Sequence, residues 1–167
     1  MTQNVEVSLT LQEFLASVEA AKMRMVASIG LNHASTYQRS FMKRLNEEVV
    51  GACVEVAFAK YKEKFWMPGL NTFHLTGDYG KVETRGTSIP NGKLIIRDND
   101  EDSRPFVLGI CDGNTVILAG WLYGHEAKKD EFISNPNGYR QAWFVPQGRL
   151  RPIRTKAGNM RGIGLTE

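Results

Sequence analysis

Two carboxylates and two cations stand close together in residues 77–85 of the chain. Asp78 is predicted to lie in a glycine-rich turn, and Glu83 on the extended segment that follows, two residues before Arg85. Side chains at i and i+2 of a strand point to the same face, so Glu83 and Arg85 are predicted to share a face that the turn allows Asp78 to reach. Such a carboxylate pair suits a hard divalent cation, Mg²⁺ or Mn²⁺, and Arg85 could neutralise charge on a phosphate under attack. The same peptide also fits a hairpin with solvated charges and a cross-strand ion pair.

Two further acidic residues lie upstream, on a segment with helical periodicity. Glu48 and Glu55 are seven residues apart, on one stripe beside the apolar face of the helix. Glu55 stands between two valines, which predicts a partly buried carboxylate that needs a partner. No cation lies at i,i+3 or i,i+4 from it, so Glu55 is a candidate for the same site, with Glu48 as an accessory residue. A solvated head group, or a stretched pairing with Lys62, is the alternative.

Helices that could position these groups are predicted in the first part of the chain. Thr10 and Glu13 have the spacing of a capping box, and apolar residues recur behind them at helical spacing up to Gly30. A second helix is predicted from about Ser35 to Lys64, ended by a Pro-Gly pair.

Strands are predicted in the second part, because short β-branched and aromatic runs alternate with turn signals. The turns at 90–92 and 112–114 suit tight hairpins and predict an antiparallel meander, and the acidic run 98–102 is predicted to be another hairpin turn. The predicted strands are Thr72–Leu75, Lys81–Thr87, Lys93–Arg97, Phe106–Cys111, Val116–Leu122 and Ala142–Val145.

The composition is that of a globular domain, with 42% hydrophobic and 23% charged residues among 167. It excludes a disordered or fibrous chain. No stretch approaches the ~20 apolar residues that cross a bilayer, so no membrane is expected as a partner, and the N-terminus has no secretory pattern. Cys53 and Cys111 lie far apart within apolar segments, which predicts buried thiols and a cytoplasmic location.

The charge of the chain is uneven. Residues 149–167 hold five of the 21 basic residues and one of the 18 acidic residues. A basic segment suits a polyanion such as DNA, although such ends are also common solubilising tails. The candidate nucleic-acid-binding residues are Arg149, Arg151, Arg154, Lys156 and Arg161.

The order of these motifs resembles the PD-(D/E)XK nuclease superfamily, and more closely small phage-encoded proteins of that kind. The resemblance rests on five segments between about residues 45 and 153. They are 51–55 (Gly-Ala-Cys-Val-Glu), 78–85, the Pro-Phe-Val-Leu run 105–108, the segment 120–126, which begins Gly-Trp, and the segment 144–150, which begins Phe-Val-Pro. It implies that Asp78, Glu83 and the backbone carbonyl of Thr84 bind the metal, with Glu55 binding directly or through water.

Arg85 departs from the superfamily pattern, since active members usually have Lys at this position. An arginine effectively cannot lose its proton, although it can still hold a phosphate, and Lys81 could replace the missing amine. The resemblance therefore implies Mg²⁺-dependent hydrolysis of DNA phosphodiesters by Glu55, Asp78, Glu83 and Arg85, or else an inactive nuclease fold that binds nucleic acid or a protein.

The expected architecture is a single α/β (α+β) domain over residues 1–154, with a basic flexible tail over 155–167. Helices are expected within 1–66 and a mixed sheet of about five strands within 72–153. The resemblance implies a restriction-endonuclease-like core.

Overall fold

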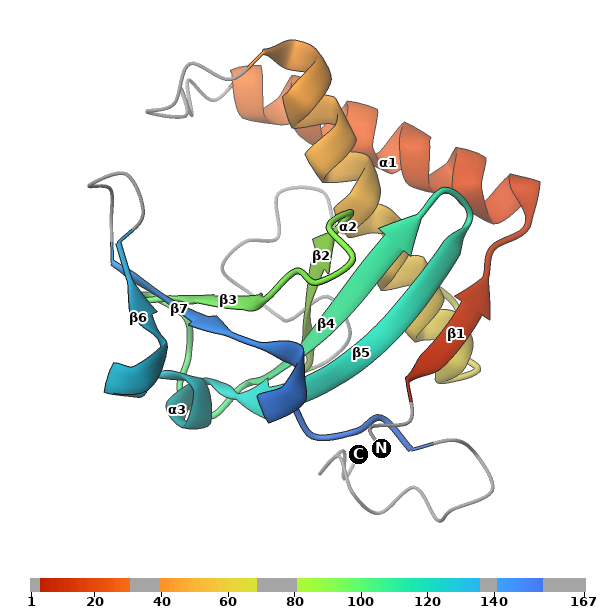
Figure 1. Cartoon of the computed structure of the whole chain (residues 1–167). Helices are drawn as coiled ribbons and strands as arrows, with labels where there is room; N and C mark the ends of the chain where they lie inside the picture. The colour runs from red at the N-terminus through yellow and green to blue at the C-terminus, as the bar shows by residue number, and fades with distance from the viewer. Residues whose placement is uncertain (1–3, 31–39, 69–80, 136–140, 155–167) are drawn as a thin grey trace.

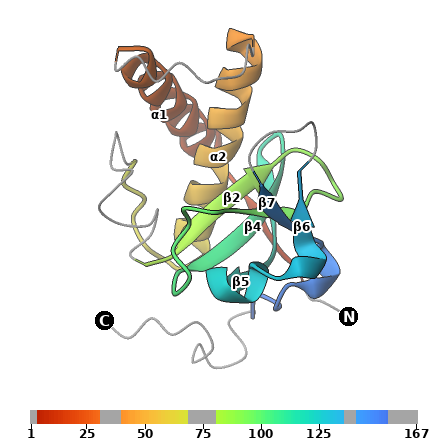
Figure 2. The same cartoon turned by 90° about the vertical axis from the view of Figure 1, so that its left-hand side faces the viewer.

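A computed structural model describes residues 4–30, 40–68, 81–135 and 141–154. One long helix lies against a sheet, the other long helix packs on the first, and a second, smaller sheet lies on the other side of the larger one (Figures 1 and 2). The chain is therefore a mixed α+β protein, as the sequence predicts. Its principal elements are β1 (Val5–Ser8), α1 (Leu11–Gly30), α2 (Phe41–Tyr61), β2 (Glu83–Thr87), β3 (Leu94–Arg97), β4 (Pro105–Asp112), β5 (Thr115–Tyr123), α3 (Gly124–Ala127), β6 (Ile133–Ser134) and β7 (Ala142–Val145).

Capping side chains begin both long helices. In the predicted capping box of α1, the Thr10 backbone N–H donates to Glu13 Oε2 at 2.7 Å, and the Glu13 N–H donates to Thr10 Oγ1 at 3.2 Å. α2 follows Ser40, whose hydroxyl accepts from the Lys43 N–H at 3.2 Å. The predicted start near Ser35 lies outside the described residues. α2 ends at Tyr61, three residues before the predicted end.

The larger sheet has the strand order β1-β5-β4-β2. β4 and β5 form the predicted hairpin, with Gly113 at a positive φ of 60° in its turn. β2 instead runs parallel to β4, and β1, which the sequence did not predict, pairs with β5. The expectation that residues 1–66 are helical is therefore wrong for Val5–Ser8.

The predicted meander is also wrong for β3. The turn before it forms, with the Gly92 N–H donating to the Ile89 carbonyl at 2.9 Å, but it leads the chain into the second sheet. There β3 pairs with β7, in the order β3-β7-β6. The acidic turn 98–102 returns the chain to β4, so it joins two sheets and closes no hairpin. The predicted strand Thr72–Leu75 lies outside the described residues.

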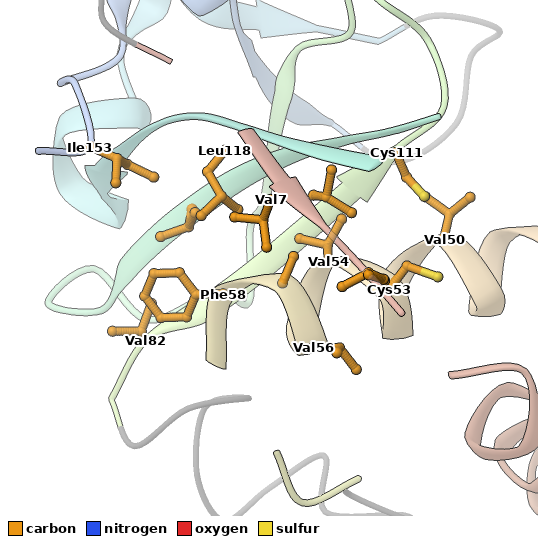
Figure 3. Close-up of a cluster of buried hydrophobic side chains, with 14 of the residues drawn as sticks. Val7, Val50, Cys53, Val54, Val56, Phe58, Val82, Cys111, Leu118 and Ile153 are labelled. Carbon is orange, nitrogen blue, oxygen red and sulfur yellow. The ribbon is translucent and has the colours of Figure 1, made fainter. Parts of the chain in front are cut away.

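The larger sheet is the middle of three layers, because each of its faces supports a separate core. Helix α2 covers one face, with a cluster that includes Val54, Val107 and Leu118 (Figure 3). The second sheet covers the other face, where Leu108 packs with Ile96. The alternation of side chains along the strands assigns each residue to one core or the other.

Two glycines allow α2 to lie close to the sheet. Gly86 of β2 is paired with Gly109 of β4. A Cβ at Gly109 would lie 2.4 Å from Val54 Cγ1, and a Cβ at Gly86 would lie 3.1 Å from the Val50 carbonyl oxygen. Both valines are buried, so they have little room to move away from an added methyl group.

Cys53 and Cys111 are buried free thiols in the same cluster, as predicted. In the described part of the chain, no helix is both long and apolar enough to cross a bilayer.

The glycine contact makes Gly109→Ala a destabilising change. We expect it to lower the free energy of unfolding by about 1–3 kcal/mol, the usual cost of overpacking a core. Gly51→Ala is the matched control on α2, since an added Cβ there would meet nothing within 4 Å. It should stabilise the helix by about 0.5–1 kcal/mol. Urea unfolding of both variants measures the difference, and a neutral Gly109→Ala would contradict the close approach of α2.

Candidate functional site

The alternation of side chains along β2 positions the predicted Glu-x-Arg pair. Glu83 is paired with Phe106 of β4, and Arg85 with Leu108. Both β4 residues belong to the core between the two sheets. Neighbouring residues of a parallel pair point to the same face, so Glu83 and Arg85 share the face that lies away from α2. Their predicted common face is confirmed.

Glu83 lies within reach of two arginines. Arg85 Nη1 lies 3.1 Å from Glu83 Oε1, and Arg104 Nη1 donates to Glu83 Oε2 at 3.4 Å. The Glu83 side chain is 21% exposed, so solvent screens these contacts only in part. Its negative charge is compensated before any metal ion binds.

Arg85 joins Glu83 to a second carboxylate. Its Nη2 donates to Asp100 Oδ1 at 2.8 Å, and its guanidinium carbon lies 5.4 Å from the centre of the Phe106 ring. The Nε–H of Arg85 is buried, and no atom among the described residues accepts it. Such unpaired buried donors are rare in folded proteins.

Asp100 is a residue of this cluster that the sequence reasoning missed. Its side chain is 11% exposed, and its second oxygen accepts from the Arg97 N–H at 2.7 Å. The sequence shows only an acidic run, and its spacing does not indicate which carboxylate turns back toward β2. Arg104 was also missed, because it lies 21 residues from Glu83 in sequence and only the fold brings the two together.

An ammonium group holds the acidic turn in place. Lys128 Nζ donates to the carbonyl oxygens of Asp98 and Asp100, at 3.1 and 2.6 Å, and lies 2.7 Å from Asp102 Oδ1. The ammonium group of Lys128 therefore balances part of the negative charge of this acidic loop. Through the Asp100 backbone, Lys128 also helps to position the carboxylate that holds Arg85.

Glu55 does not join this cluster. Arg24 of α1 grips it with two hydrogen bonds, at 2.6 and 2.8 Å, and Trp66 Nε1 donates to it at 3.2 Å. The Glu55 side chain is 9% exposed and that of Arg24 is 13% exposed. Because α2 covers one face of the sheet and Glu83 lies on the other, the expectation that Glu55 faces Glu83 is wrong. Its partner could not be found by helical spacing, since Arg24 lies 31 residues away.

Glu48 belongs with the Glu55 pair. Although much of its side chain is exposed, desolvation of the carboxylate raises the pKa of Glu48; the charge of Arg24 opposes this shift, and the charge of Glu55 adds to it. Arg24 and Glu55 therefore lie near Glu48. Like Glu55, Glu48 belongs to the α2 side of the larger sheet, whereas Glu83 points to the other side.

Of the other predicted site residues, the metal candidate Thr84 and the accessory residue Lys81 lie in the described part of the chain. Thr84 is buried and faces α2, as its pairing with Val107 requires. Lys81 is exposed. Its charge acts on Glu101: hydrogen bonds from Ser103 and Arg104, with a smaller contribution from the charge of Lys81, lower the pKa of the Glu101 carboxyl. Asp78 lies outside the described residues. Within residues 4–30, 40–68, 81–135 and 141–154, no three His, Cys, Asp or Glu side chains form a metal-binding group.

Two of the three predicted binding arginines that the structure describes form ion pairs with acidic side chains. Arg149 Nη2 lies 2.7 Å from Glu131 Oε2, and Arg151 forms an ion pair with Glu126. The Arg154 carbonyl accepts from the Tyr61 hydroxyl, and its side chain is exposed. The last two predicted binding residues, Lys156 and Arg161, lie outside the described residues.

The ion pair with Arg24 makes Glu55 important for the stability of the fold. Glu55→Gln should lower the free energy of unfolding by about 1.5–3 kcal/mol, because it breaks the charged two-point contact with the largely buried guanidinium of Arg24. Replacing both partners by methionine should recover much of this loss. Glu19→Gln, which breaks the exposed pair with Lys22, is the control and should change little. Equal effects of the Glu55 and Glu19 substitutions in urea unfolding would contradict this role.

Comparison with known proteins leaves these residues without a relative to guide their interpretation. No family model, no curated protein and no solved structure matches the chain. Its function is therefore argued from the geometry above and from the sequence motifs.

Proposed function

We propose that the protein hydrolyses DNA phosphodiester bonds with Mg²⁺ or Mn²⁺, at the end of the sheet where β2 begins. The observation that carries this proposal is the shared face of Glu83 and Arg85, with 3.1 Å between carboxylate and guanidinium. Asp78 is five residues upstream in the sequence. A carboxylate for a metal ion and a cation for a phosphate are the minimum such a site requires.

The donor chemistry of the chain fits this ion. Asp78 and Glu83 would hold it, since carboxylate oxygens are the ligands that Mg²⁺ takes, together with water. When bound, the ion supplies a water molecule of lowered pKa as the nucleophile. Glu83 would exchange its 3.4 Å contact with Arg104 for this ligand role. The buried Nε–H of Arg85 would gain an acceptor in a phosphate oxygen.

One residue of the expected catalytic set, Glu55, and the accessory residue Glu48 leave the proposal. Glu55 and Glu48 lie beside Arg24, on the helix side of the sheet. In place of a helix carboxylate, Asp100 shares Arg85 with Glu83. The proposal thereby loses its strongest expected support, and it rests on the strand pair and Asp78.

A second candidate is an inactive nuclease fold that binds nucleic acid or a protein without cleaving. It is favoured by the neutralised state of Glu83, which two arginines already contact. Arg85 in place of the usual lysine favours it too, because an arginine cannot act as a proton acceptor. In this case the arginines would contact phosphates directly.

Cleavage of plasmid, linear and single-stranded DNA with Mg²⁺ or Mn²⁺ decides between these candidates. If the protein is a nuclease, Asp78→Asn and Glu83→Gln should each lower the rate at least about 100-fold, because each removes a charge that holds the ion. Glu101→Gln is the control, since it removes an exposed partner of Arg104 and should leave most of the activity. Arg85→Lys would raise the rate if the site lacks an amine, and lower it if Arg85 clamps a phosphate. If no condition gives cleavage, the nuclease is refuted and the inactive, binding fold remains as the candidate.

Binding to DNA has its own test at the basic C-terminus. Truncation after Arg154 removes Lys156 and Arg161. If both contact phosphates of duplex DNA, the slope of log K against log salt should fall by about 1.8, at roughly 0.9 per phosphate. Fluorescence anisotropy at several salt concentrations measures this slope. An unchanged slope would show that the tail makes no phosphate contact.

A further inference from the structure

Three aromatic rings and one guanidinium form a continuous row where β5 runs into α3. The rings of Trp121 and Tyr123 are 5.3 Å apart, edge to face at 83°, and those of Tyr123 and His125 are stacked at 5.6 Å and 14°. The Arg151 guanidinium carbon lies 5.0 Å from the centre of the Trp121 ring and 5.9 Å from that of Tyr123. We call these four residues the aromatic row.

The backbone holds Arg151 against the row. Arg151 and Trp121 exchange two backbone hydrogen bonds, each of 3.0 Å. This close approach requires Gly120, which has a φ of 149° and whose added Cβ would lie 2.8 Å from the Arg151 carbonyl oxygen. The Gly-Trp pair of the sequence thus has a structural reason.

Side-chain hydrogen bonds hold the other end of the row. Glu126 accepts from the Tyr123 N–H at 3.0 Å with one oxygen and pairs with Arg151 through the other. A ring nitrogen of His125, Nδ1, lies 3.0 Å from the Asp102 carbonyl oxygen. Rings that are fixed in advance lose little conformational freedom when a ligand binds.

The row is accessible from one end. Trp121 is buried at the inner end of the row, where it packs against Tyr123. Tyr123 is half-buried, and His125 is exposed at the outer end. The Arg151 side chain is 47% exposed, and a guanidinium has donors beyond those that Glu126 occupies. Among the described residues, the stack of parallel rings ends at the exposed imidazole of His125.

The row lies at the same end of the larger sheet as Glu83 but on the opposite face, because Trp121 and Tyr123 pack with the core on the α2 side. Glu83 is paired with Phe106, and Phe106 with Leu122, the residue before Tyr123. Glu83 and Leu122 are thus two strand spacings apart, about 10 Å. Arg104 contacts Glu83, and its carbonyl accepts from the Gly124 N–H at 3.0 Å.

We propose that the aromatic row binds unpaired bases of single-stranded DNA. A base would extend the stack on His125, and Arg151 would contact a neighbouring phosphate. Aromatic rings beside cations are how proteins hold single strands without reading their sequence, whereas the bases of a duplex have both faces covered. This inference rests on the proposed function, which makes DNA the ligand, and names its single-stranded form.

The test is anisotropy of a labelled 12-nucleotide thymidine oligomer, with a duplex of the same length for comparison, both in EDTA. Wild-type protein should bind the single strand more tightly than the duplex. His125→Ala and Tyr123→Leu should each weaken single-strand binding at least about fivefold, the lower end of the effect of base stacking on an aromatic side chain. Phe41→Ala is the control, because this aromatic is 69% exposed at the far end of α2, and it should bind like wild type.

His125→Ala keeps the test decisive if Tyr123→Leu does not fold, because His125 is exposed. Unchanged binding by folded His125→Ala would overturn the proposal, and so would equal or tighter binding of the duplex. EDTA removes metal ions, so this result is independent of cleavage. Absence of cleavage, with binding that depends on His125, would refute the nuclease and retain the single-strand site. Cleavage together with binding that does not depend on His125 would support the nuclease and refute the single-strand site.

Discussion

The contact of α2 with the paired glycines of β2 and β4 is the constraint on which the rest of the structure depends. Once Val54 lies against Gly86 and Gly109, that face of the sheet is closed. The period of two along β2 then leaves Glu83 and Arg85 on the opposite face. Glu55 follows Val54 in sequence, so it points to the side of α2, where Arg24 of α1 meets it. One packing contact therefore separates carboxylates that the sequence motifs suggest are partners.

The two carboxylates differ in how firmly their charge is held. Glu55 has a two-point contact with Arg24 and a third donor in Trp66, in a nearly dry environment. Releasing it would break both charged hydrogen bonds to the largely buried guanidinium of Arg24, which costs several kcal/mol. Glu83 is more exposed, and its contact with Arg104 is long. A metal ion can compete for a carboxylate in the second situation far more readily than in the first.

The sequence predicted those features that depend on near neighbours. The Thr10 capping box, the turn at Gly113, the strand Ala142–Val145 and the common face of Glu83 and Arg85 are all set within a few residues. The parallel pairing of β2 with β4 could not be predicted, because the chain leaves for another sheet between them. The Arg24 partner of Glu55 and the Asp100 partner of Arg85 were missed for the same reason, since tertiary folding brings them together.

The strand directions also explain why chemistry collects at one end of the larger sheet. β2 and β4 are parallel and both begin there, while β5 is antiparallel to β4 and ends there. The starts of two strands supply Glu83 and Arg104, and the end of the third supplies Tyr123. Loops that join strands at such an end are under little packing constraint, so they can carry polar groups without disturbing either core. Glu83 and Arg104 are partly exposed, whereas the neighbouring Phe106 is buried, so substitutions at these polar groups disturb the cores less than a change at Phe106 would.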